Sequence, residues 1–240
     1  MDGLEELIGI SLVMIAGVIR GFSGFGSAMI LAPSLSLLFN PQQVVATILL
    51  LEIIASVGLI PEALPQIKWQ QVLPMALAAI VTIPVGTYFL VLLDPDLMRR
   101  IIGGLLLIFV LLLWVSQRLH VPSRMSLSYG VGALSGFLTG LTGMGGPPVV
   151  LYELSRRGTV AANRANLISF FALTQFVALG VYYFKGILSM VVFQRFLLFF
   201  PSFLVGLIIG SFLFKWVNEN LFRNLVFGFL VIIGLLAISI

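Results

Sequence analysis

Long apolar runs recur along this chain, and they constrain its fold more than any other feature. Each run is about 20 residues long, which is the length that a helix needs to cross the hydrocarbon core of a bilayer. Because lipid offers no hydrogen bonds to the backbone, such runs must be helical. The sequence therefore predicts an all-α polytopic membrane protein. Its expected spans are residues 43–64, 70–93, 97–118, 165–184, 190–215 and 220–240.

The composition supports the bilayer as the solvent of this protein. Of its 240 residues, 60% are hydrophobic and only 9% are charged, whereas soluble domains carry roughly 25% charged residues. The basic residues are scattered over short loops and form no patch, so no nucleic-acid partner is expected. The absence of cysteine excludes disulfides and thiolate metal sites. The acidic start (Asp2, Glu5, Glu6) is unlike that of a signal peptide.

Two regions depart from the simple pattern of spans, because glycines interrupt them. Residues 4–39 form two apolar arms around the stretch 21–27, and residues 127–155 form two arms around 140–148. The arms of the second region, at about 13–16 residues each, reach only roughly 20–24 Å, less than the ~30 Å hydrocarbon core. Each region is therefore expected to be a helical hairpin whose glycine-rich tip lies deep in the membrane.

The order of these elements repeats, which indicates an internal duplication. When Gly21 is placed on Gly140, other residues of the two halves coincide. The matched pairs are Gly17 with Gly136, Gly24 with Gly143, Gly26 with Gly145, Ala46 with Ala165, Gly86 with Gly210, Leu97 with Leu221, Arg99 with Arg223 and Gly104 with Gly228. Each half, 1–120 and 121–240, is then one hairpin followed by three spans. Because this makes an odd number of crossings, the second repeat is expected to be inverted.

The two glycine tips are the strongest candidates for a binding site. A helix that breaks inside a bilayer leaves backbone N–H groups that must line a cavity or meet a ligand. The second arm of each hairpin starts at the break, so its N-terminal end carries partial positive charge and favours an anion. Tips from two inverted halves would meet near the midplane, where secondary transporters bind substrate. The candidate substrate-binding residues are Arg20, Gly21, Ser23, Gly24, Gly26, Ser27, Thr139, Gly140, Thr142, Gly143, Gly145 and Gly146.

Close packing of helices is the alternative explanation for these glycines. Small residues spaced by four allow two helix backbones to approach each other. This explanation applies above all to the series Gly132, Gly136 and Gly140, and to Gly206 with Gly210.

Two charged residues fall inside the expected membrane region. Arg20 precedes the first tip, where an arginine costs at least about 2.5–3.5 kcal/mol and should face a cavity or a partner. Its partner is either an anionic substrate or Glu52, which lies in the middle of the span 43–64, and a substrate could displace or join the pair. Glu52 is also a candidate proton carrier. Gln175 is a further polar residue within a span, and either packing or a substrate path explains it.

An enzymatic alternative rests on one motif. Gly21-Phe22-Ser23-Gly24 matches the G-x-S-G of intramembrane serine proteases. Such an enzyme needs a base within reach of its serine, and the single histidine, His120, lies in a polar loop. The sequence contains no Walker loop, dinucleotide fingerprint or metal-ligand cluster, so no cofactor is expected.

The two glycine motifs resemble those of the sulfite exporter TauE/SafE family of membrane permeases. The resemblance rests on GFSGFGSAMILAPSL at 21–35, on GLTGMGGPPVVLYEL at 140–154, and on the duplicated layout over nearly the whole chain. It implies a polytopic permease that exports or takes up sulfite, sulfonates or related small anions, with residues 21–27 and 140–148 at its site. Gly146-Pro147-Pro148 and Tyr152 depart from the family pattern, in which further glycine and a proline are common.

These features predict a secondary transporter of the cell membrane that moves a small oxyanion, such as sulfite or an organosulfonate, by alternating access. An anion channel is the second hypothesis. The two differ in that a channel needs a continuous wet pore, whereas a transporter needs an occluded site. An intramembrane serine hydrolase is the third. The expected partners are the small anion, the lipid bilayer, and a coupling proton or other ion, and a homo-oligomer is an open alternative.

The loop charges predict the orientation of the chain. With the N-terminus outside, most basic loop residues lie at the cytoplasmic face, as the positive-inside rule requires. These are Lys68, Arg118, Arg124, Arg156, Arg157, Arg164, Lys215 and Arg223, whereas Arg99, Arg100, Lys185 and Arg195 are exceptions.

Both termini are therefore expected to face outside and the loop 156–164 to face the cytoplasm. Because the chain has no cysteine of its own, Gly3→Cys and Gly158→Cys can be tested one at a time with a membrane-impermeant thiol reagent. Intact cells should label only the first, and inverted vesicles only the second. Labelling of both from the same side would exclude the inverted arrangement.

Overall fold

The computed structural model of the chain describes residues 3–116, 125–156 and 159–216, and within these ranges it is helical with no strand. The helices are α1 (Gly3–Ser23), α2 (Ser27–Leu38), α3 (Pro41–Ala63), α4 (Trp69–Leu92), α5 (Pro95–Ser116), α6 (Met125–Thr142), α7 (Gly146–Ser155), α8 (Val160–Phe184) and α9 (Met190–Leu213), with a 3-10 turn at Leu64–Gln66. Helices α1, α3, α4, α8 and α9 are long and apolar enough to cross a membrane. The prediction of an all-α polytopic protein is confirmed, while the expected span 220–240 lies outside the described residues.

Local capping signals explain where several helices begin. Asn40 accepts a hydrogen bond from the backbone N–H of Gln42 at 3.0 Å, and a proline follows it at the first helical position of α3. Thr159 caps α8 in the same way. Helix α8 therefore begins at Val160 rather than at the expected residue 165. As a consequence Arg164 lies one turn inside this helix, and is not the loop residue that the charge pattern indicated.

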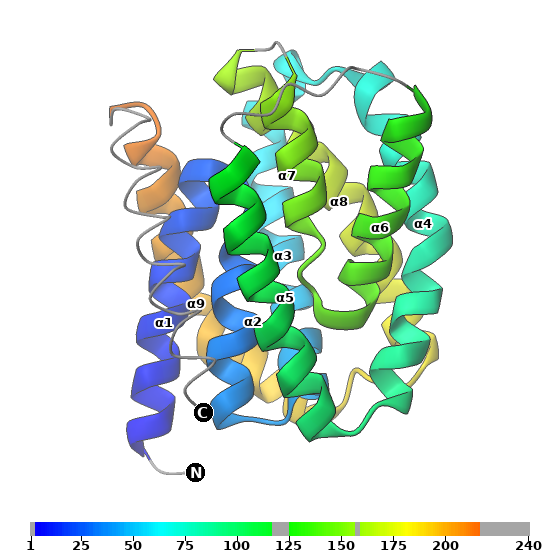
Figure 1. Cartoon of the computed structure of the whole chain (residues 1–240). Helices are drawn as coiled ribbons and strands as arrows, with labels where there is room; N and C mark the ends of the chain where they lie inside the picture. The colour runs from blue at the N-terminus through cyan, green and yellow to red at the C-terminus, as the bar shows by residue number, and fades with distance from the viewer. Residues whose placement is uncertain (1–2, 117–124, 157–158, 217–240) are drawn as a thin grey trace.

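Both glycine-rich stretches interrupt helices, as the sequence predicts. The first break separates α1 from α2 and the second separates α6 from α7. Gly24 and Gly143 occupy the same place in the two breaks and have φ angles of 78° and 72°, a conformation that residues with a side chain rarely adopt. The hairpin of α1 and α2 opens toward the end of the molecule where the N-terminus lies, and that of α6 and α7 opens toward the other end (Figure 1).

The arms of these hairpins are unequal, which corrects the expectation of two short arms. Helices α1 and α6 have 21 and 18 residues, whereas α2 and α7 have only 12 and 10. At 1.5 Å per residue the two short arms reach about 18 Å and 15 Å from opposite ends. Together these lengths come close to the ~30 Å of a hydrocarbon core. The first turns of α2 and α7 therefore meet near the middle of the bundle.

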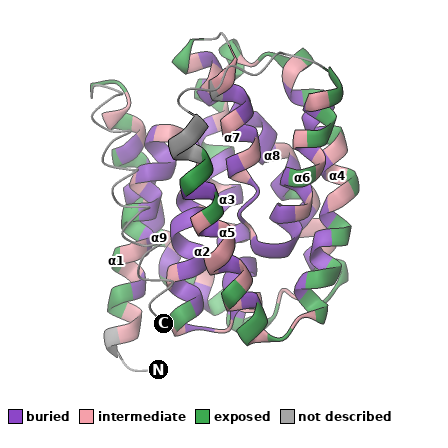
Figure 2. Ribbon diagram, in the orientation of Figure 1, coloured by how far each residue is buried: buried purple, intermediate pink, exposed green. Residues whose placement is uncertain are grey.

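Burial in this bundle is distributed as lipid would require. Exposed residues lie on the outer faces of the helices, and the central helices are mostly buried (Figure 2). Many of the exposed residues are large and apolar, such as Val81 with 73% of its surface exposed. Charged and amide side chains, among them Arg20, Glu52 and Asn166, are buried instead. A polar interior inside an apolar surface is typical of a membrane protein whose interior carries the function.

Glycines hold two pairs of helices in backbone contact. Helix α1 lies along α9, and α4 lies along α6. A Cβ atom at Gly21 would overlap the carbonyl oxygen of Leu207 on α9, and one at Gly140 would overlap that of Ile83 on α4. The packing explanation is therefore confirmed for Gly132, Gly136, Gly140, Gly206 and Gly210, each of which faces a backbone oxygen in this way.

These contacts agree with the proposed duplication. Gly21 and Gly140 are matched residues, and so are their partners Leu207 and Ile83, because the alignment places Gly86 on Gly210. Each half thus packs its first helix on the third long helix of the other half, with the same contacts. This correspondence supports the division into repeats 1–120 and 121–240, which remains a proposal.

Backbone contact of this kind predicts opposite effects for two Gly→Ala substitutions. A Cβ at Gly86 would overlap the carbonyl oxygen of Phe137, whereas one at Gly104 on α5 would have no atom of the described residues within 4 Å. Gly86→Ala should therefore lower the thermal unfolding midpoint in detergent, because overpacking costs about 1–3 kcal/mol. Gly104→Ala should leave the midpoint unchanged or raise it, since alanine is the better helix former. Equal midpoints for the two variants would contradict the role assigned to Gly86.

Candidate functional site

A small cavity lies between the two helix breaks. The first break contributes Gly26, and the second contributes Gly143, Met144 and Gly146. Its volume of about 20 Å³ is room for about one water molecule. Of the sequence-predicted residues, Arg20, Gly26, Glu52, Thr139, Gly143 and Gly146 line this cavity. The two tips therefore come together at one place.

The other predicted residues support the tips from outside the cavity. The backbone of Gly21 and Gly140 faces a neighbouring helix, as described above. A Cβ at Gly24 would lie 3.1 Å from the Arg164 side chain, and one at Gly145 would overlap the Thr139 hydroxyl. These glycines allow close approach of protein groups and do not themselves line the cavity.

Two hydroxyl groups shape the breaks in the same way. The hydroxyl of Ser23 donates to the carbonyl of Ile19 at 2.7 Å and accepts from the N–H of Phe25 at 3.3 Å. The hydroxyl of Thr142 donates to the carbonyl of Leu138 at 3.0 Å and accepts from the N–H of Met144 at 3.2 Å. Each hydroxyl thus pairs a backbone N–H that the break leaves without a helical carbonyl.

These bonds also bear on the enzymatic alternative. The carbonyl oxygen of Phe25, also 2.7 Å from the Ser23 hydroxyl, is a second acceptor for the single proton of this hydroxyl, so backbone groups surround it. Within the described part of the chain no lysine or histidine hydrogen-bonds to it, and His120 lies outside that part.

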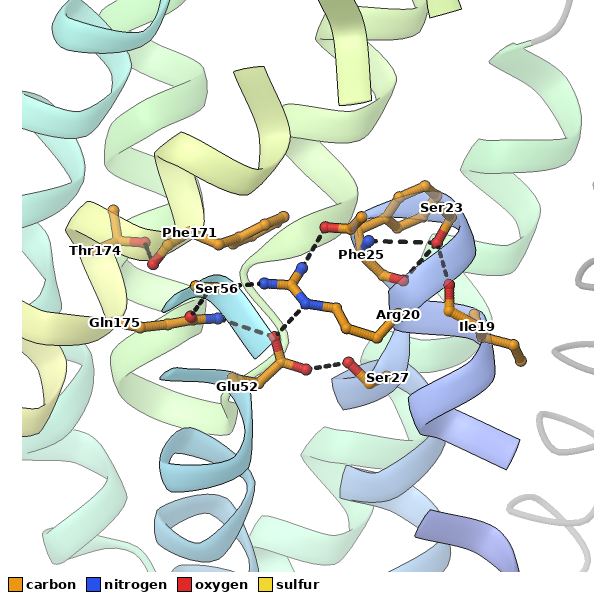
Figure 3. A network of polar contacts seen from close by, with 11 residues as sticks. Ile19, Arg20, Ser23, Phe25, Ser27, Glu52, Ser56, Phe171, Thr174 and Gln175 are labelled. Atoms are coloured by element: carbon orange, nitrogen blue, oxygen red, sulfur yellow. Dashed lines mark hydrogen bonds and ion pairs between the residues drawn. The ribbon is translucent and has the colours of Figure 1, made fainter. Parts of the chain in front are cut away.

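Arg20 is the central charge of the site. Only 1% of its surface is exposed. One terminal nitrogen donates to the carbonyl of Gly24, and the other donates to the hydroxyl of Ser56 at 2.9 Å. Its Nε lies 3.2 Å from Oε2 of Glu52, and the guanidinium lies 4.9 Å from the centre of the Phe171 ring (Figure 3). The predicted pairing of Arg20 with Glu52 is confirmed, and its contact with a substrate remains a prediction.

The Glu52 carboxylate collects donors from three helices around it (Figure 3). The hydroxyl of Ser27, the first residue of α2, donates to Oε1. The amide of Gln175 on α8 donates to Oε2 at 2.9 Å. The amide oxygen of Gln175 in turn accepts from the Ser56 hydroxyl at 2.7 Å, which fixes the direction of the amide. The carboxylate therefore lies at the N-terminal end of α2, where the sequence predicts an anion.

A second arginine closes the first hairpin. Arg164 donates from Nε to the carbonyl of Phe22 at 3.0 Å and from Nη2 to that of Gly21 at 2.7 Å. These carbonyls belong to the last turn of α1. No further turn follows, so no helical N–H group is available to donate to them. Its Nη1 lies 3.5 Å from Oε2 of Glu62, and Phe214 lies beneath its guanidinium.

The two tips differ in the donors that they offer. The first turn of α2, from Ser27 onward, contains no proline, so each of its residues carries a backbone N–H. The first turn of α7 contains Pro147 and Pro148, which have no N–H. The dipole of α7 remains, but the hydrogen-bond donors for an anion are concentrated at α2.

Ser56, Phe171 and Arg164 were not found by sequence reasoning. The repeat alignment contained a signal for the first two, since extending it from Ala46 and Ala165 places Ser56 on Gln175 and Phe171 on Glu52. These matched positions face one another at the contact of α3 with α8. Arg164 could have been found from Thr159, which signals an earlier start of its helix.

Comparison with known proteins agrees with the architecture described. No curated protein and no solved structure matches this chain. The family model described as Sulfite exporter TauE/SafE matches residues 9–237, which include both hairpins and the helices after them. Together with the five long apolar helices, this match identifies a multi-pass membrane protein of a transporter family. The chain belongs to the sulfite exporter TauE/SafE family.

Proposed function

We propose that this protein is a secondary transporter that carries a small oxyanion, sulfite or an organosulfonate, across the cytoplasmic membrane by alternating access. The observation that carries the proposal is the position of Arg20, a buried cation beside a cavity that both helix breaks line. Family membership supports the transport of sulfur oxyanions. The bound anion would lie between Arg20 and the first turn of α2.

Several groups at this place favour negative charge. The N-terminal end of α2 carries partial positive charge, which is worth up to about 2 kcal/mol at partly buried sites. Arg20 adds a full charge, and the Ser27 hydroxyl and the Gln175 amide are donors already directed at a carboxylate. An oxyanion with three oxygens can accept from the same groups.

The small volume of the cavity favours a carrier over a channel. Its volume of about 20 Å³ is too small for a sulfonate, so the anion can enter only after the helices around it move. Two hairpins that open toward opposite ends provide two routes of access, one on each side of the cavity. Rocking of one half against the other would open these routes in turn. A channel would instead conduct through a continuous pore, and its flux would not saturate as a carrier's does.

A transporter also explains the tips better than a hydrolase does. The hydroxyl of Ser23 is used to hold the break together, and its counterpart Thr142 does the same in the second half. Catalysis is not required to explain either residue. We therefore propose no enzymatic activity.

Two substitutions test the anion site by different physical routes. Arg20→Gln removes the charge, and because a hydrogen bond to a charged group is worth roughly 1.5–3 kcal/mol, anion affinity should fall at least about tenfold. Gly143→Val forces a side chain onto a residue with φ 72° and should distort the second tip, with a similar loss. The measurement is binding of sulfite, sulfate and methanesulfonate to purified protein, with neutral dimethyl sulfone as the control ligand.

Matched variants separate binding from folding. Arg195→Gln removes another buried arginine, which contacts Gln43 outside the cavity. Gly104→Val adds the same side chain at a helical glycine whose Cβ would meet no atom of the described residues. Both should bind anions like the parent. The double variant Arg20→Gln with Glu52→Gln removes both members of the ion pair, so it leaves no unpaired charge at this site and controls for instability. Parent-like binding by Arg20→Gln and Gly143→Val would show that the tips are packing devices and would refute the proposal.

A further inference from the structure

The Glu52 carboxylate occupies the place that an anionic substrate needs. Arg20, Ser27 and Gln175 converge on it from α1, α2 and α8, and these are the groups assigned above to the anion. Arg20 Nε is buried and has no hydrogen-bond partner of good geometry among the described residues, although Glu52 lies 3.2 Å away. The protein thus holds a carboxylate of its own in a site built for an oxyanion, with one donor still incompletely used.

The cavity is too small for a substrate to bind while the Glu52 carboxylate keeps its position. The cavity beside Glu52 has about 20 Å³ of room, enough for about one water molecule. An oxyanion that reached the same donors would overlap the carboxylate. Glu52 must therefore swing away from Arg20 before the substrate can bind there.

The balance of charge also opposes binding of a substrate while Glu52 stays ionised. The charges next to the cavity cancel, because Arg20 pairs with Glu52 and Arg164 pairs with Glu62. An anion that binds while Glu52 stays ionised leaves the buried site with a net negative charge, and burying an unpaired charge is strongly unfavourable. One proton on Glu52 restores neutrality, since the anion then replaces the carboxylate as the counter-ion of Arg20.

From these observations we infer that Glu52 is a built-in competitor of the substrate, and that each monovalent anion binds together with one proton taken up by Glu52. The inference rests on the proposed function and assigns its coupling ion. The chemical step is small. A proton from the solution adds to a carboxylate oxygen of Glu52 and the ion pair with Arg20 ends. The anion then accepts hydrogen bonds from the donors that Glu52 has released. Anion and proton then cross in the same direction, and the empty protein returns with its ion pair restored.

The groups that face Glu52 allow this exchange. From α1 it faces Arg20, from α2 the hydroxyl of Ser27, and from α8 the amide of Gln175. On its own helix, Ser56 joins Arg20 to Gln175. Arg20 is the one charged partner at hydrogen-bonding distance within the described residues. The charge state of this site therefore depends on a single acid and a single permanent cation.

The experiment measures proton uptake when methanesulfonate binds to the purified, full-length protein. This ligand carries one fixed charge near neutral pH, so any pH dependence belongs to the protein. In weakly buffered detergent solution the parent should take up about one proton per anion bound. Its affinity should fall by up to about tenfold per pH unit as the pH rises through the range in which only the complex holds the proton. Infrared difference spectra should show a new protonated-carboxyl band on binding.

Two variants decide whether Glu52 is the group that accepts the proton. Glu52→Gln mimics the protonated side chain, so it should bind methanesulfonate without proton uptake, without pH dependence and without the infrared band. Asp96→Asn makes the same change from acid to amide at an exposed carboxylate that pairs with Arg99 outside the cavity, and should take up a proton as the parent does. Folding of both is checked by their unfolding midpoints.

The outcomes distinguish this inference from the function on which it rests. Binding by the parent without proton uptake, or binding that requires sodium instead of a proton, would refute the role of Glu52 and leave the anion site standing. Retained proton uptake in Glu52→Gln would have the same consequence. Failure of methanesulfonate to bind the parent at any pH would refute the anion site itself, and the inference with it.

Discussion

Backbone hydrogen bonding in the absence of water is the constraint on which this structure depends. A helix that ends inside a bilayer leaves carbonyl and N–H groups that lipid cannot satisfy. At the end of α1, Arg20 and Arg164 donate to the carbonyls of Gly24, Gly21 and Phe22. Ser23 and its counterpart Thr142 satisfy further groups at the two breaks. The two arginines that help to make a broken helix tolerable thereby also bring positive charge to the break.

The sequence predicts those features of this arrangement that are determined by neighbouring residues in the chain. Apolar length and glycine breaks are local, so the helices, the two hairpins and the identity of the tips follow from sequence reasoning. The pairing of Arg20 with Glu52 was one of two stated alternatives, because both residues fall within the membrane region. The unequal arms and the early start of α8 were missed. Boundaries depend on caps such as Thr159, whose signal is weak inside an apolar chain.

The contacts that sequence reasoning could not supply are those made across the interface of the two halves. Ser56 and Gln175 are ordinary polar residues on their own helices. They become part of the site only because α3 and α8 cross where these residues meet. The repeat alignment relates them as matched positions, but it gives no contact unless the halves are known to pack about a common axis.

Residues at matched positions of the two halves differ in charge, and the site is therefore asymmetric. Where the first half has Arg20 and Glu52, the alignment places Thr139 and Phe171 in the second. Conversely, Arg164 of the second half corresponds to Val45 in the first. All these charges cluster around the first tip, while Pro147 and Pro148 remove donors from the second. Matched helix contacts in the two halves thus surround an asymmetric cluster of charged side chains. A buried ion pair of this kind contributes little net stability, because desolvation offsets the Coulomb attraction. In the proposed mechanism its value lies in exchange, because a carboxylate neutralised by a proton is a counter-ion that an external anion would replace.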